Sequence, residues 1–175
     1  MATDIPGVVI RPAEKTDCAE IARLIKDLAE YEGHRDHAKL TKEELEEDGF
    51  GEDRWFYGFV AEDPNAVRSE TDPPRLIGCA VYFMMYYSNE GRAVYMEDLF
   101  VSSEFRKKGI GKTLMKKVAQ VGVDNNCVAM FFNCLRHNTP SLAFYKRQGA
   151  EDLAETEAWR NLVLNRNDLE KLASS

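Results

Sequence analysis

The first third of the chain carries apolar residues at helical spacing. Four of them repeat every three or four positions and predict an amphipathic helix that Asp17 caps and that reaches residues 31–32: Ile21, Leu24, Ile25 and Leu28. A short strand-like run, 8–12, precedes it and ends at a proline. Thr41 and Glu44 have capping-box spacing, which predicts a second, short helix ending at Asp48–Gly49.

The middle of the chain is aromatic and β-branched, which indicates strands. We expect strands at 55–62, 76–87 and 93–101, separated by polar, proline-containing or glycine-containing loops. Because the connections are polar and the last is a short turn at 88–91, the three strands are predicted to form an antiparallel meander.

A glycine-rich turn at 106–111 then leads into a helical pattern and a further strand at 127–134. This strand–helix–strand unit predicts a right-handed crossover and a parallel strand pair. Another helix is expected to start at Asn138 or Thr139, with Pro140 in its first turn, and to run to Gly149. A last strand at 159–164 and a polar tail complete an α/β fold with a mixed sheet.

Size and charge narrow the class of protein. The 175 residues, 44% hydrophobic and 30% charged, fit one globular domain spanning 1–175. No run approaches the roughly 20 apolar residues of a membrane span, and the N-terminus lacks a signal pattern, so we expect a cytoplasmic protein without membrane partners. The net charge of -7 disfavours nucleic acid as a partner and favours a small cationic molecule.

Metal binding is not expected. The four cysteines include no Cys-x-x-Cys pair and are interpreted as reduced thiols. His34 and His37 lie in a polar stretch without a nearby cysteine, so we interpret them as solvated loop residues.

The glycine turn is the strongest candidate for chemistry. A turn at a helix N-terminus presents backbone N–H groups to phosphate, and glycines at 109 and 111 allow close approach. A P-loop is an alternative because Gly111-Lys112-Thr113 matches its end, but the required first glycine falls on Arg106. A purely structural tight turn is a further alternative.

Two adjacent carboxylates, Glu97 and Asp98, precede this turn in a strand that is otherwise apolar. Buried carboxylates without a partner or a function are uncommon. Because side chains alternate along a strand, just one of the two is expected to face a site.

Arg106-x-x-Gly109-x-Gly111, after a strand and before a helix, resembles the coenzyme loop of the GCN5-related N-acetyltransferase (GNAT) family. The resemblance covers nearly the whole chain. Within that family, the chain is similar to the polyamine and thialysine branches. It is carried by five segments in order: residues 9–13, 23–26, 48–51, 95–98 and 144–147.

The resemblance implies a GNAT fold, a central mixed β-sheet flanked by helices, with a splayed parallel strand pair diverging after Val101 and Asn133. It also implies acetyl transfer from acetyl-CoA, as cosubstrate, to a primary amine of a small cationic acceptor, without metal, in a homodimer. The residues that it implies for acetyl-CoA are Leu99, Phe100, Val101, Arg106, Lys107, Lys108, Gly109, Ile110, Gly111, Lys112, Asn138, Pro140 and Ser141.

The same resemblance assigns chemical roles. Glu97 is implied as the base or proton relay, the N–H groups of residues 99–101 as donors to the thioester oxygen, and Tyr145 as the proton donor to the leaving sulfur. The residues implied for the acceptor are Tyr31, Glu32, Glu97, Asp98, Phe131, Phe132, Asn133 and Glu157.

The chain departs from the polyamine pattern at Tyr87 and Asn89, where those enzymes carry an aspartate and a tryptophan. A shorter diamine, thialysine or a lysine-like amine therefore competes with spermidine and spermine as acceptor. Acetylation of protein lysines and a non-catalytic acyl-CoA sensor are the alternative functions.

Overall fold

The structure is a computed structural model that describes residues 7–63, 65, 75–156 and 162–174. The chain divides into two compact units, residues 1–135 and 136–175, which are treated separately below.

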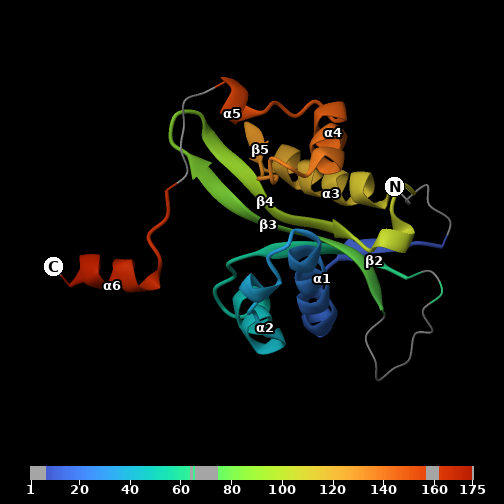
Figure 1. Cartoon of the computed structure of the whole chain (residues 1–175), viewed down its shortest axis with the longest axis horizontal. Coiled ribbons are helices and arrows are strands. Elements are labelled where there is room, and N and C mark those ends of the chain that lie inside the picture. The colour runs from blue at the N-terminus through green and yellow to red at the C-terminus, as the bar shows by residue number, and fades with distance from the viewer. Residues whose placement is uncertain (1–6, 64, 66–74, 157–161, 175) are drawn as a thin grey trace. The chain divides into compact units, whose positions relative to one another are not determined.

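The first unit is built on a five-stranded sheet (Figure 1). Its strands lie in the order of the sequence: β1 (Ile10–Pro12), β2 (Tyr57–Glu62), β3 (Leu76–Tyr87), β4 (Gly91–Val101) and β5 (Ala129–Phe131). β1 to β4 are antiparallel neighbours, whereas β4 and β5 run parallel. The predicted meander, the parallel pair and the mixed sheet are confirmed.

The parallel strands diverge earlier than expected. β4 and β5 pair only from Ala93 opposite Ala129 to Tyr95 opposite Phe131, and β5 ends there. The divergence expected after Val101 and Asn133 is therefore wrong. Residues 96–101 of β4 have no strand on the side away from β3 among the described residues. At about 3.3 Å per residue, this open edge is about 20 Å long.

Helices cover both faces of the sheet (Figure 1). α1 (Cys18–Tyr31) and α2 (Lys42–Phe50) lie on one face and α3 (Ile110–Asp124) lies on the other. Short 3-10 turns occur at Lys15–Asp17, Arg35–His37 and Ser103–Phe105. The predicted apolar stripe of α1 is buried against β2, β3 and the end of β4, in a cluster that includes Ile21, Leu24, Val60, Cys79 and Phe100.

The N-termini of α1 and α2 are stabilised by different side-chain contacts. Thr41 and Glu44 form the predicted capping box of α2, although that helix continues past Asp48–Gly49 to Phe50. Asp17 occupies the N-cap position of α1, but its side chain does not cap the helix. It accepts hydrogen bonds from Arg11 instead, because that guanidinium lies beside it at 2.6 and 2.9 Å.

The described part of the second unit contains three helices: α4 (Thr139–Arg147), α5 (Leu153–Thr156) and α6 (Arg166–Ala173). Asn138 caps α4 as predicted, by accepting from the Ser141 N–H at 3.3 Å. The strand expected at 159–164 falls partly outside the described residues, and 162–164 form no regular element. The predicted polar tail contains a helix, α6, which Asn165 caps.

The described residues contain no helix with both the length and the apolar character needed to cross a bilayer. The same residues contain no group of three or more His, Cys, Asp or Glu side chains placed to hold a metal ion. All four cysteines are free thiols, and Cys18 and Cys79 are buried.

Candidate active site

The predicted glycine turn lies between the end of β4 and the start of α3. Lys107 and Gly109 both have positive φ, 61° and 87°, and Gly109 is the N-cap of α3. The first helical hydrogen bond is donated by Thr113 to the Gly109 carbonyl at 3.0 Å, so the N–H groups of residues 110–112 precede it. Left-handed residues followed directly by helix N-terminal N–H groups form a concave donor site that suits phosphate.

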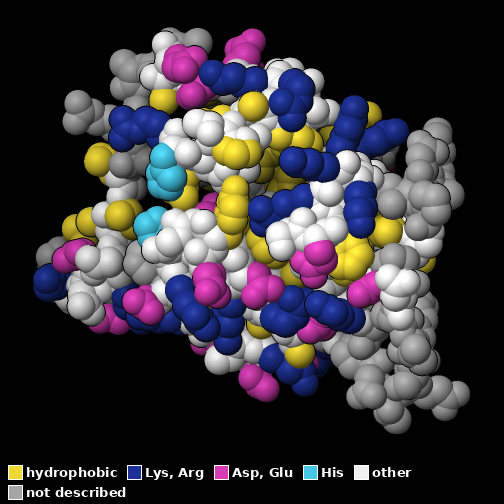
Figure 2. Space-filling model, turned by 45° about the vertical axis from the view of Figure 1, so that its right-hand side comes forward, with side chains coloured by type: hydrophobic (Ala, Val, Ile, Leu, Met, Phe, Trp, Pro, Cys, Tyr) yellow, Lys and Arg dark blue, Asp and Glu magenta, His cyan; other side chains and the backbone are white. Residues whose placement is uncertain are grey.

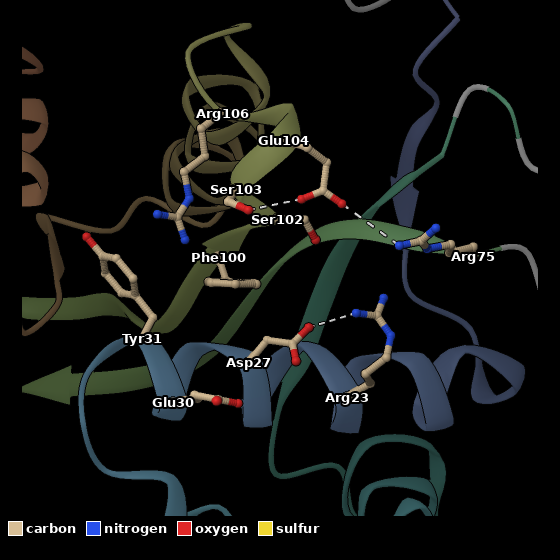
Figure 3. A pocket seen from close by; sticks show the side chains of 10 residues that line it. All are labelled: Arg23, Asp27, Glu30, Tyr31, Arg75, Phe100, Ser102, Ser103, Glu104 and Arg106. Carbon is tan, nitrogen blue, oxygen red and sulfur yellow. Dashed lines mark hydrogen bonds and ion pairs between the residues drawn. The ribbon is translucent and has the colours of Figure 1, made fainter.

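The Arg106 side chain makes its contacts outside this turn. Its Nε donates to the Val101 carbonyl at 2.8 Å, and its guanidinium lies over the rings of Tyr31 at 4.5 Å and Phe100 at 5.4 Å (Figure 3). Arg106 thus connects the turn to the C-terminal end of α1. The sequence contained no signal for this contact, because Tyr31 and Arg106 are 75 positions apart.

A pocket of about 350 Å³ lies beneath Arg106, between α1 and the residues that follow β4 (Figure 3). Charged side chains of both signs line it, and two ion pairs lie in its wall: Arg23 with Asp27 along α1 at 2.8 Å, and Arg75 with Glu104 at 3.9 Å. Side chains of both signs also intermingle on the face shown in Figure 2. The lining residues are Arg23, Asp27, Glu30, Tyr31, Arg75, Phe100, Ser102, Ser103, Glu104 and Arg106.

A β-bulge places the two adjacent carboxylates of β4. Val81 of β3 pairs with Asp98, but its neighbour Tyr82 pairs with Met96, so Glu97 is an extra residue without a partner on β3. The bulge interrupts the alternation of side chains. The expectation that alternation leaves just one of Glu97 and Asp98 on the site face therefore does not apply.

The registers identify the face on which these carboxylates lie. Cys79, Val81 and Phe83 share one face of β3, and their partners on β4 are Phe100, Asp98 and Tyr95. Cys79 and Phe100 pack in the core cluster with α1, so Asp98 lies on the α1 face of the sheet.

The charges in this region are coupled. Burial, as the largest cause, and the negative charges of Glu97 and Glu32 together raise the pKa of Asp98 to about 6. Burial and the charge on Glu97 also raise the pKa of Tyr95. Glu32 is the C-cap of α1, directly after Tyr31. Three carboxylates from two elements therefore form an acidic cluster, which we define as Glu32, Glu97 and Asp98.

The remaining predicted residues are distributed over both units. Phe131 ends β5, and Phe132 and Asn133 follow it. Asn138, Pro140 and Ser141 form the start of α4, and Tyr145 lies on the same helix, where its ring meets that of Phe144 edge-on at 5.2 Å. Glu157 lies outside the described residues.

Comparisons with known proteins agree with this architecture. A family model described as "Acetyltransferase (GNAT) family" matches residues 19–150. Thialysine N-epsilon-acetyltransferase of Bos taurus is 41% identical over 87% of this chain and 89% of its own length. Spermidine/spermine N(1)-acetyltransferase-like protein 1 of Homo sapiens is 36% identical over 94% of this chain, which corresponds to 23% of that protein. An integron cassette protein from the mobile metagenome of V. cholerae superposes with a TM-score of 0.71 at 29% identity, covering 97% of this chain and 99% of its own.

Proposed function

Since this chain belongs to the GNAT family of acetyltransferases, we propose that it transfers an acetyl group from acetyl-CoA to a primary amine of a small cationic acceptor. The acceptors in the names of its relatives, thialysine and spermidine or spermine, are amines of this class. The observation that carries the proposal is the acidic cluster: Asp98 lies on the α1 face of β4, and the charges of Glu32 and of the bulge residue Glu97 both act on it.

The residues at the turn and along β4 fit the coenzyme. The donor site around Lys107 and Gly109 suits a pyrophosphate, and the lysines at 107, 108 and 112 add positive charge. The edge of β4 that pairs with no strand among the described residues offers backbone groups to an extended pantetheine arm. When bound, acetyl-CoA supplies a thioester whose carbonyl carbon accepts the amine nitrogen. N–H groups among residues 99–101 would donate to its carbonyl oxygen.

The acidic cluster handles the proton of the acceptor. An alkylammonium has a pKa of about 10.4, so the acceptor arrives protonated and must lose a proton before it can react. Asp98, with a pKa of about 6, is mostly ionised at pH 7. Asp98 and Glu32 would hold the ammonium group, and Glu97, which is exposed, would accept its proton directly or through water.

Tyr145 would act at the end of the reaction. Its phenol on α4 would donate a proton to the departing sulfur, while Asn138, Pro140 and Ser141 at the start of the same helix would contact the coenzyme.

A thiol-release assay with acetyl-CoA tests the proposal. The acceptors are putrescine, spermidine, spermine, thialysine and lysine, with a lysine-containing peptide as a separate arm. Release with at least one free small amine is expected. Release with the peptide alone would identify a protein acetyltransferase, and coenzyme binding without release with any amine would identify an acyl-CoA sensor. Either of these outcomes would overturn the proposal.

A further inference from the structure

Four aromatic side chains continue the α1 face of the sheet beyond the acidic cluster. Phe83 and Tyr95 are direct partners across β3 and β4, and their rings stack at 5.0 Å with an interplanar angle of 18°. Phe131 is the partner of Tyr95 on β5, so it shares that face. Tyr87 lies on the same face of β3 as Phe83, and its ring meets Phe131 edge-on at 5.4 Å. We define Phe83, Tyr87, Tyr95 and Phe131 as the aromatic strip.

The strip is accessible. All four side chains are half-buried. Under α1, by contrast, the same face of the sheet consists of buried core residues such as Cys79 and Phe100. Figure 1 shows the paired ends of β3 and β4 extending beyond α1. The strip therefore starts where the cover of α1 ends.

The strip is also next to the acidic cluster. Tyr95 is two residues from Glu97 on β4, about 7 Å along a strand. The charge on Glu97 raises the pKa of Tyr95, which is consistent with this proximity. An ammonium group held by Glu97 and Asp98 would thus lie about one short alkyl chain away from the aromatic rings. Ring faces attract ammonium groups, and more strongly when the groups are partly desolvated.

We infer that the aromatic strip binds a second ammonium group of the acceptor, about 7 Å from the reacting amine. This inference rests on the proposed function and assigns side chains to the recognition of a short acceptor with two cationic nitrogens. The α,ω-diamines have this chemistry, and so does the α-ammonium group of a lysine-like amino acid. A monoamine of the same length lacks the second contact.

Specificity for the second charge provides the test. For the wild type, Tyr87→Leu and Phe131→Leu, kcat/KM is measured with 1,5-diaminopentane, lysine and pentylamine. The diamine and lysine values are each divided by the pentylamine value, so that each ratio reports the effect of the second charge. Leucine keeps an apolar side chain but removes the ring. Tyr86→Leu is the matched control because Tyr86 is the next residue of β3, points to the opposite face and is 73% exposed.

We expect each ring variant to lower the diamine-to-monoamine ratio about three- to thirtyfold, while Tyr86→Leu keeps it within twofold. If the ratio for lysine over pentylamine falls in the same variants and the diamine ratio does not, the second ammonium is that of an amino acid. Ratios that fall for neither acceptor, or that fall equally in Tyr86→Leu, would overturn the inference. Absence of thiol release by the wild type with every amine is a different result, because it would overturn the proposed function itself.

Discussion

The guanidinium of Arg106 lies 4.5 Å from the centre of the Tyr31 ring, and its Nε holds the last carbonyl of β4, that of Val101. One side chain thus joins the glycine turn to the end of α1, where the acidic cluster begins. A purely phosphate-binding role of Arg106 would not involve Tyr31.

Replacing Tyr31 with leucine should therefore weaken coenzyme binding, even though Tyr31 is predicted to contact the acceptor. We expect Arg106→Met to raise the Kd for coenzyme A about tenfold and Tyr31→Leu to raise it less, because loss of a cation–π contact costs about 1 kcal/mol. Isothermal titration calorimetry of both variants and the double variant measures the coupling. Unchanged affinity in Tyr31→Leu, or fully additive effects, would show that Arg106 acts on the phosphate alone.

Asp98→Asn should stabilise the protein at neutral pH. The pKa of Asp98 is raised in the folded state from 3.8 to about 6, so folding favours its protonated form and the ionised form is destabilising. The wild type should lose about 1–3 kcal/mol of its free energy of unfolding as the pH rises from about 4 to about 7. The variant lacks this loss. Urea titrations at pH 4.5 and 7.5 measure it, and equal gains at both pH values would contradict the prediction.

Folding stability is expected to depend on glycine at position 109 but not at position 111. Gly109 has a φ of 87°, which an alanine adopts at a cost of about 1 kcal/mol or more. A Cβ at Gly111 would meet the Val101 side chain at an ordinary 3.7 Å, within a helix that favours alanine. Gly109→Ala should lower the melting temperature, and Gly111→Ala should keep or raise it. Loss of stability in both variants would point to crowding at the turn instead.

Arg11 is expected to be essential for folding stability. Its Nε lies 2.6 Å from Glu62 and its terminal nitrogens hold Asp17, and both carboxylates are buried. Arg11→Met would remove the guanidinium that pairs with both buried carboxylates, at a cost of about 3–5 kcal/mol. Chemical denaturation measures the loss. The control is Arg166→Ala, whose pair with Glu170 is exposed and should contribute less than about 1 kcal/mol.

Two conservative variants separate the proton-transfer roles. Glu97→Gln should reduce kcat most near neutral pH, where few acceptor molecules are deprotonated, and raising the pH should recover part of it. Tyr145→Phe should slow thiol release without this recovery. The pH profile of kcat distinguishes them, and full activity in both variants would exclude both assignments.

The sequence predicted those parts of the fold that depend on local pattern. The stripe from Ile21 to Leu28 and the capping box at Thr41 are local signals, and both produced the expected helices. The turn at Gly109 was predictable because few residues besides glycine readily adopt positive φ before a helix.

Features that depend on tertiary contacts were not predictable. The bulge at Glu97 arises from the register between β3 and β4, which no residue type in β4 specifies. Asp17 has the residue type of a helix cap, but its carboxylate pairs with the Arg11 guanidinium instead. Asp17 is fully buried and Arg11 is partly buried, which favours this charge-assisted contact. The aromatic strip combines residues of three strands, so it becomes visible only when their registers are known.

The early divergence of β4 and β5 has a consequence for handling the protein. In the described part of the chain, the edge of β4 from 96 to 101 has no neighbouring strand, and such an edge can also recruit a strand from another polypeptide. Coenzyme and self-association would then compete for one row of backbone groups. Saturating coenzyme A should accordingly keep concentrated samples in solution longer.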